Sequence, residues 1–128
     1  MERKLIRILD ANLNREREAI RVVEDIARFI LDDKNLMRKL KAVRHAVTEA
    51  SRLLPLSYGA MLRERESVYD VGNDMAIYHK KKICIRDVMT SNLKRAQESA
   101  RVLEEISKVV SRRASRAFQS LRFALYQL

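Results

Sequence analysis

The stretch NLNREREAIRVVEDI, from Asn12 to Ile26, recurs eighty residues later as NLKRAQESARVLEEI, from Asn92 to Ile106. The two copies are identical at eight of their fifteen positions. Helix formation requires apolar residues at a regular spacing, but it does not require the same Asn, Arg and Glu at the same places. The repeat therefore indicates an internal duplication, and it indicates that particular polar side chains matter.

The composition favours a helical domain. The 128 residues suit one domain with one core, and two Gly and one Pro leave few positions for turns. No apolar run is long enough to span a bilayer, and the charged start of the chain is unlike a signal sequence. Cys84 is the single cysteine, which excludes a disulfide framework and a Cys-based zinc site. We expect a single all-α domain over residues 1–128, located in the cytoplasm.

The formal net charge is +10, from 27 Lys and Arg against 17 Asp and Glu. This balance favours an anionic partner such as nucleic acid, a membrane surface or a phosphorylated metabolite. A basic surface laced with salt bridges explains the same numbers, so the charge alone does not choose a function.

The hydrophobic spacing predicts four helices, at about residues 2–31, 34–54, 81–110 and 113–128. Asp32 and Asp33 end the first helix and offer a cap for the second, which Pro55 stops. Each half, residues 1–55 and 80–128, is thus a long helix followed by a shorter one, and a central loop at 56–79 joins them. Two such hairpins related by an internal two-fold axis predict a four-helix bundle.

The repeated polar residues fall at defined places on these helices. Asn12 lies in the centre of an apolar stripe and Asn92 does the same in its own helix, at 100° per residue. Arg15 and Arg95 lie at the edge of the stripe, and Glu18 and Glu98 come next.

A buried Asn without partners costs roughly 2 kcal/mol or more, so the asparagines need a partner. Two interpretations stay open for the Asn and Glu positions. One is a ligand site, and the other is a core hydrogen-bond network across the two-fold axis in which Arg15 and Glu18 satisfy the asparagines. For Arg15 and Arg95 the planar guanidinium favours a phosphate or carboxylate ligand.

Other charged residues divide into two groups. Surface or interhelical salt bridges are the simpler interpretation for the outer members of the motif: Arg21, Glu24, Arg101 and Glu104. Positive charge on the shorter helices adds candidates for phosphate binding: Lys41, Arg44 and Arg122. His45 and His79 have no partner at ligand spacing, and we assign no metal site to them.

The central loop holds a second polar cluster. Arg65 is a candidate phosphate clamp, Asp70 or Asp74 a candidate magnesium ligand, and Gly72 a place where backbone amides approach a ligand. On spacing alone, an ordinary charged surface loop is the simpler interpretation.

Together, the repeat and the central loop carry a resemblance. The opening Asp10-Ala11-Asn12-Leu13, the segment from Arg65 to Gly72 and the second motif copy are similar to the small all-helical hydroxymethylpyrimidine-phosphate kinase domain of thiamine biosynthesis. That domain often occurs joined to thiamine-phosphate synthase. The resemblance covers nearly the whole chain, with Glu66-Ser67 in place of the usual Asp-Thr.

The resemblance implies phosphorylation of 4-amino-5-hydroxymethyl-2-methylpyrimidine phosphate to its diphosphate, with ATP and Mg²⁺. On this hypothesis the basic residues bind phosphates, namely Arg15, Arg95 and Arg65 with support from Lys41, Arg44 and Arg122. The acidic residues Glu18, Glu98 and Asp70 are the catalytic candidates, through magnesium, and Asp70 is the residue we assign as its ligand. Asn12 and Asn92 hold the pyrimidine or orient phosphate oxygens, and Gly72 belongs to the phosphate site. No Gly-rich nucleotide loop is present in the sequence, so ATP is implied by the resemblance alone.

Two other functions stay open. A nucleic-acid-binding module suits the net charge but predicts Lys and Arg gathered on one face, whereas here they are interleaved with acids. A non-catalytic regulatory or dimerisation module of thiamine metabolism predicts pyrimidine-phosphate binding without turnover. The long amphipathic helices are also compatible with a homodimer. A functional association with thiamine-phosphate synthase follows from the resemblance, and we expect no membrane partner.

Overall fold

The computed structural model describes residues 3–56 and 83–128. Within these ranges it contains four α-helices and no strand: α1 (Arg3–Phe29), α2 (Lys34–Ser51), α4 (Ile85–Ser107) and α5 (Arg112–Tyr126). The all-α fold and the helical bundle are confirmed. The helix boundaries lie within about four residues of those predicted from the spacing.

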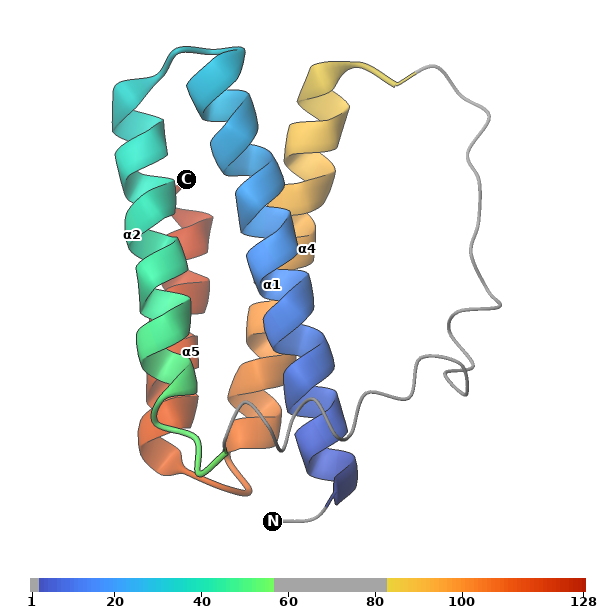
Figure 1. The fold of residues 1–128 in the computed structure, drawn as a ribbon, viewed down its shortest axis with the longest axis vertical. Helices are drawn as coiled ribbons and strands as arrows, with labels where there is room; N and C mark the ends of the chain where they lie inside the picture. The colour runs from blue at the N-terminus through green and yellow to red at the C-terminus, as the bar shows by residue number, and fades with distance from the viewer. Residues whose placement is uncertain (1–2, 57–82) are drawn as a thin grey trace.

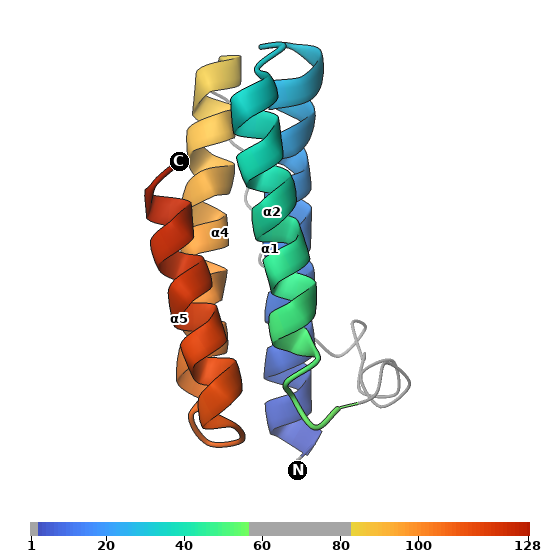
Figure 2. The same ribbon diagram turned by 90° about the vertical axis from the view of Figure 1, so that its left-hand side faces the viewer.

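The helices form a bundle in which each packs against two neighbours. α1 and α2 run in opposite directions, as do α4 and α5, so each half of the chain is a hairpin (Figure 1). α1 packs against both α2 and α4, and α5 packs against both α4 and α2. A quarter turn shows α2 and α5 side by side on the near face (Figure 2). The two motif copies therefore lie on neighbouring helices, α1 and α4, which run in opposite directions.

Local hydrogen bonds explain where the helices begin and end. Asp32 adopts a φ of 49°, and the next residue, Asp33, accepts a hydrogen bond from the backbone N–H of Leu36 at 3.0 Å. This confirms the predicted cap of the second helix. Ser111 caps α5 in the same way through the N–H of Ala114. At the start of α4, the N–H of Cys84 donates to the carboxylate of Asp87 at 3.2 Å.

The core lies along the facing sides of the helices. The largest side chains within it come from all four helices, with Phe118 and Leu103 fully buried beside Leu9 and Val47. Each such side chain stabilises the fold by about 1.5–3 kcal/mol. Helical spacing predicts Ile30 on the apolar side of the first helix, but Ile30 is exposed because α1 ends one residue before it.

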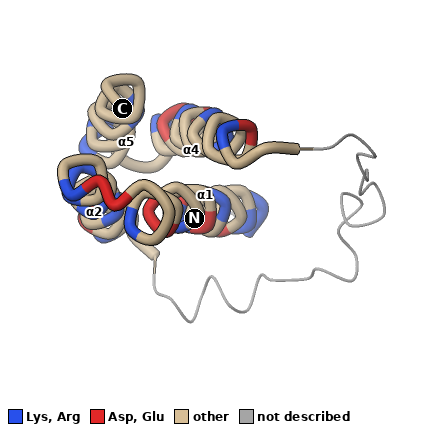
Figure 3. The backbone as a smooth tube through the Cα atoms, turned by 90° about the horizontal axis from the view of Figure 1, so that it is seen from above, with Lys and Arg blue, Asp and Glu red and all other residues tan. Residues whose placement is uncertain are grey.

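None of the described helices combines the length and the apolar character that crossing a membrane requires. Lys and Arg lie on all four helices, and acidic residues lie among them on three (Figure 3). The basic charge is therefore spread over the bundle, as the sequence indicates.

Candidate functional site

The centre of the internal two-fold axis is marked by one contact between the motif copies. Glu16 of α1 is hydrogen-bonded to Ser99 of α4, and the position equivalent to Ser99 in the first copy is Ala19. Because the helices run in opposite directions, the axis lies midway between positions 16 and 19 in α1. The corresponding point in α4 is midway between positions 96 and 99. The two copies of the motif therefore lie antiparallel to each other and pair near their middles.

This register separates the two asparagines. Asn12 and Asn92 lie toward opposite ends of the paired motifs, about 17 Å apart along the helices. The side-chain amide of Asn12 donates to the carbonyl of Ile8 at 2.9 Å, and that of Asn92 donates to the carbonyl of Val88 at 2.8 Å. Each asparagine thus bonds within its own helix. The alternative in which Arg15 and Glu18 satisfy the asparagines is absent from the described residues.

Four charged side chains stand at equivalent positions of the two motif copies on α1 and α4, and we call this set the α1–α4 seam: Arg15, Glu18, Arg95 and Glu98. All four are exposed. The register sets Glu18 and Glu98 near the two-fold axis, within about one helical turn of each other along the helices. Arg15 and Arg95 lie on either side of them, about 5–8 Å apart along the helices. Among the described residues none of the four forms an ion pair.

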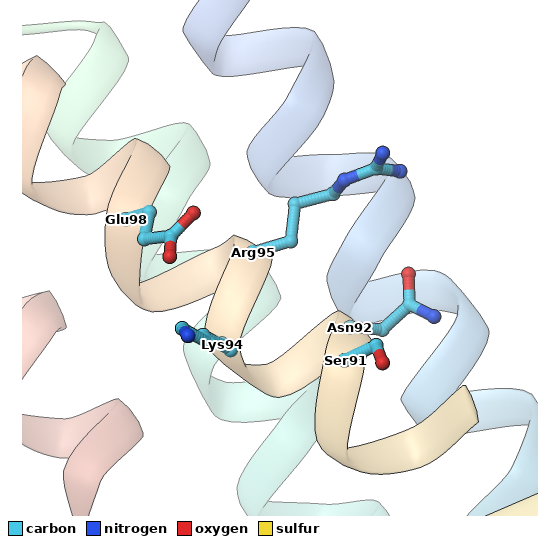
Figure 4. A pocket seen from close by; sticks show the side chains of 5 residues that line it. All are labelled: Ser91, Asn92, Lys94, Arg95 and Glu98. Atoms are coloured by element: carbon cyan, nitrogen blue, oxygen red, sulfur yellow. The ribbon is translucent and has the colours of Figure 1, made fainter. Parts of the chain in front are cut away.

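A pocket of about 400 Å³ opens at the second motif copy, lined by Ser91, Asn92, Lys94, Arg95 and Glu98. The side chains of Asn92 and Arg95 extend from α4 to the side on which α1 passes (Figure 4). A second pocket of about 380 Å³ adjoins it and shares Lys94 and Glu98. Three of the residues predicted from the repeat therefore line one pocket.

The outer acids of the motif form interhelical ion pairs. Glu24 of α1 accepts two hydrogen bonds from Arg44 of α2, at 2.9 and 3.3 Å. Glu104 of α4 is paired in the same way with Arg122 of α5, at 3.0–3.1 Å. These two pairs are related by the internal two-fold axis. They confirm the interhelical salt bridges expected for the two glutamates.

The same pairs bear on the proposed phosphate-binding residues. Arg122 is held by Glu104, which is 3% exposed, and hydrogen bonds from Arg122 to Glu104 and Tyr126 raise the pKa of that guanidinium above its usual range. Arg44 is more open, with 30% of its side chain exposed. Occupied by carboxylates, Arg44 and Arg122 have a structural role in this arrangement. Lys41 is exposed on α2.

Glu16 is a polar residue that the sequence reasoning missed. It is fully buried, and burial raises its pKa to about 8 even though the hydrogen bond from Ser99 lowers it. Its Oε1 atom has no hydrogen-bond partner among the described residues. The repeat gave no signal because Ala96 stands at the equivalent position. A glutamate on a charged helix also predicts a solvated side chain.

The predicted residues of the central loop lie outside the described residues: Arg65, Asp70, Asp74 and Gly72. The described residues contain no group of three or more His, Cys, Asp or Glu that suits a metal ion. Within that part of the chain, Glu98 is a carboxylate that lines the same pocket as Arg95.

Comparison of the sequence with known proteins identifies the family of the chain. Residues 7–128, which contain both motif copies, match the ThiD2 family. The chain belongs to the ThiD2 family. No solved structure matches it.

Several curated relatives of this ThiD2 family chain are named thiamine-phosphate synthase. It is 34% identical to a thiamine-phosphate synthase of Synechocystis sp., over 97% of this chain and 35% of the relative. It is 32% identical to the thiamine-phosphate synthase of Rhodopirellula baltica, over 97% of this chain and 33% of that protein. It is 36% identical to the thiamine-phosphate synthase of Parasynechococcus marenigrum, over 100% of this chain and 35% of that protein. The chain spans about a third of the length of the curated relatives it matches.

Proposed function

We propose that this chain acts in thiamine biosynthesis and phosphorylates 4-amino-5-hydroxymethyl-2-methylpyrimidine phosphate to its diphosphate with ATP. Membership of the ThiD2 family and similarity to proteins named thiamine-phosphate synthase support the pathway. The α1–α4 seam supports the chemistry, because it offers exposed arginines and glutamates without ion-pair partners among the described residues. A functional association with thiamine-phosphate synthase belongs to the same proposal.

The reaction requires charge to be neutralised and the reactants to be aligned. An oxygen of the acceptor phosphate attacks the terminal phosphorus of ATP, and the bond from that phosphorus to the bridging oxygen breaks to release ADP. Phosphate monoesters are largely ionised at neutral pH, since their second pKa is about 6, so the acceptor needs no general base. Catalysis then comes from positioning and electrostatic stabilisation. Arg15 and Arg95 would do both, each for one phosphate group.

Magnesium fits the acids of the seam. Mg²⁺ in phosphoryl-transfer sites is commonly held by one or two carboxylates together with substrate phosphates. Glu18 and Glu98 are exposed, free of ion pairs among the described residues and at about the same level along α1 and α4. They would hold the ion, and the ion would neutralise charge on the transferring phosphoryl group. Asp70 stays a proposed ligand from the sequence.

The test is to incubate the purified protein with the pyrimidine monophosphate, ATP and Mg²⁺ and to measure the diphosphate by chromatography. We expect Arg15→Ala and Arg95→Ala each to lower kcat/KM by about 10²–10³-fold, the effect of removing one donor to a transition-state anion. Arg52→Ala is the matched control because Arg52 is exposed and pairs only weakly with Glu49 on the same helix.

The outcomes separate the alternatives. Absence of diphosphate with any metal or phosphoryl donor, together with intact binding of the pyrimidine phosphate, would identify a non-catalytic binding module. Full activity in both arginine variants would remove the seam from the mechanism. Salt-sensitive binding of nucleic acid with no affinity for the pyrimidine phosphate would favour the nucleic-acid module.

A further inference from the structure

We infer that the outer face of α4 next to α5 binds the nucleotide, with the phosphates of ATP at Lys94 and Arg95 and the adenine base on Tyr126. The inference rests on the proposed kinase function and assigns its two substrates to different halves of the duplicated chain.

The two pockets on α4 are neighbours that share two lining residues. The pocket that contains Arg95 is about 400 Å³, and the adjoining one that contains Tyr126 is about 380 Å³. Both are lined by Lys94 and Glu98. A ligand that fills both therefore passes over Lys94, with one end at the α1–α4 seam and the other at α5.

The α5 end offers a flat aromatic surface. Tyr126 is 54% exposed, and the guanidinium of Arg122 lies 5.9 Å from the centroid of its ring. Arg122 is itself fixed by Glu104, so the ring rests on an ordered support. An exposed aromatic ring stacks well on a nucleobase, and the side-chain amide of Gln97 in the same pocket suits the hydrogen-bonding edge of a base.

The seam end offers positive charge. Lys94 forms no ion pair among the described residues, and neither does Arg95, so both are available to phosphate oxygens. Arg101 lines the α5 end but is bound to Glu105 at 3.1 Å, with 56% of its side chain exposed. The cations without ion pairs thus lie at the seam end, where the polyphosphate chain needs them.

Comparison of the two halves shows that Lys94 and Tyr126 have no counterpart of the same kind in the first half. The position equivalent to Lys94 in the first copy is Asn14. Aligning the matching pairs Glu24–Arg44 and Glu104–Arg122 makes Thr48 of α2 the equivalent of Tyr126. The first half therefore lacks both the added cation and the aromatic ring. It keeps Arg15, which is sufficient for the single phosphate of the pyrimidine substrate.

The kinetic test compares the KM values of the two substrates. Base–aromatic stacking of about 1–3 kcal/mol predicts that Tyr126→Ala raises the KM for ATP about tenfold. Tyr126→Phe keeps the ring and is expected to raise the KM for ATP less than Tyr126→Ala does. Lys94→Asn gives the second half the residue of the first and is also expected to raise the KM for ATP. In all three variants the KM for the pyrimidine phosphate is expected to stay unchanged.

Phe29→Ala is the matched control, since Phe29 is also an exposed aromatic residue near a helix end, at 67% exposure, and lines neither pocket. Thermal unfolding by circular dichroism checks that each variant is folded. A Tyr126→Ala protein in which the KM for the pyrimidine rises instead, or in which neither KM changes, would overturn the assignment.

Calorimetric titration with magnesium and a non-hydrolysable ATP analogue separates this inference from the kinase proposal. Binding that weakens about tenfold in Tyr126→Ala supports the nucleotide site even if no diphosphate is formed. If the protein forms diphosphate but its affinity for the analogue does not depend on Tyr126 and Lys94, the nucleotide site is refuted and the kinase proposal is retained. Absence of both analogue binding and turnover refutes both.

Discussion

The two halves of the chain share one interhelical pair and differ at another. Glu24–Arg44 and Glu104–Arg122 are the same interaction formed twice, once in each hairpin. At the centre of the α1–α4 contact, the pair Glu16–Ser99 faces its two-fold equivalent, Ala19–Ala96, in which both side chains are apolar.

The comparison separates what holds the bundle from what makes its halves unequal. A pair formed twice can act only as common support for the two hairpins. A polar pair that forms only once makes the two halves different. Lys94 does the same, because its equivalent in the first half is Asn14. Substitutions that make the halves more alike, or that break a shared pair in one half, therefore test this division.

The largest effect is expected at the unequal pair, from the buried carboxyl of Glu16. Its pKa is about 8 in the folded chain and near 4.5 when unfolded, so between these values the folded state binds the extra proton. The free energy of unfolding should then fall as the pH rises from about 4.5 through 8, by about 5 kcal/mol at most. Urea unfolding of wild type and Glu16→Gln across this pH range measures the difference.

Glu16→Gln serves as its own control, since it keeps the shape and removes the titration. Every other ionisable group contributes equally to both proteins. If the two proteins lose stability in parallel from pH 5 to 8, Glu16 is not protonated in the folded chain.

A smaller effect is expected when a shared pair is broken. Glu104→Ala leaves Arg122, only 11% exposed, without its carboxylate, and should lower the free energy of unfolding by about 3 kcal/mol. Glu24→Ala should cost about 1 kcal/mol, because Arg44 is 30% exposed and water replaces its partner. Urea unfolding at pH 7 gives both values. Equal losses would show that burial does not distinguish the two hairpins.

The smallest effect concerns Ser107, which is fully buried and whose hydroxyl has no hydrogen-bond partner among the described residues. Its equivalent in the first half is Ala27, also fully buried. Ser107→Ala removes an unsatisfied polar group and should raise the free energy of unfolding by about 1 kcal/mol. A rise in the midpoint of thermal unfolding is the measurement. A fall would mean that the hydroxyl has a partner.

Much of the fold was predictable from spacing, whereas the contacts of the polar residues were only partly so. Asp33 predicted the start of α2, because a helix cap is a local interaction between residues three apart in the sequence. The repeat led to the arginines of the seam because duplication shows up in the sequence itself. It did not lead to the partner of Glu104, since Arg122 lies eighteen positions away on another helix.

Glu16 differs, because its place on the helix is a signal that the sequence does carry. At 100° per residue Glu16 lies about 40° from Asn12, within the apolar stripe, whereas the exposed Glu18 lies about 120° from it. Burial is decided by which side of α1 meets α4, and a rotation of 200° between the two positions carries one into the core and the other to the surface.

The sequence by itself determined the helices, the duplication and the bundle, because apolar periodicity and capping act over a few residues. Only the tertiary structure decided the register of α1 against α4. Packing between helices set that register, and with it which charges are paired, which are buried and which remain open at the α1–α4 seam.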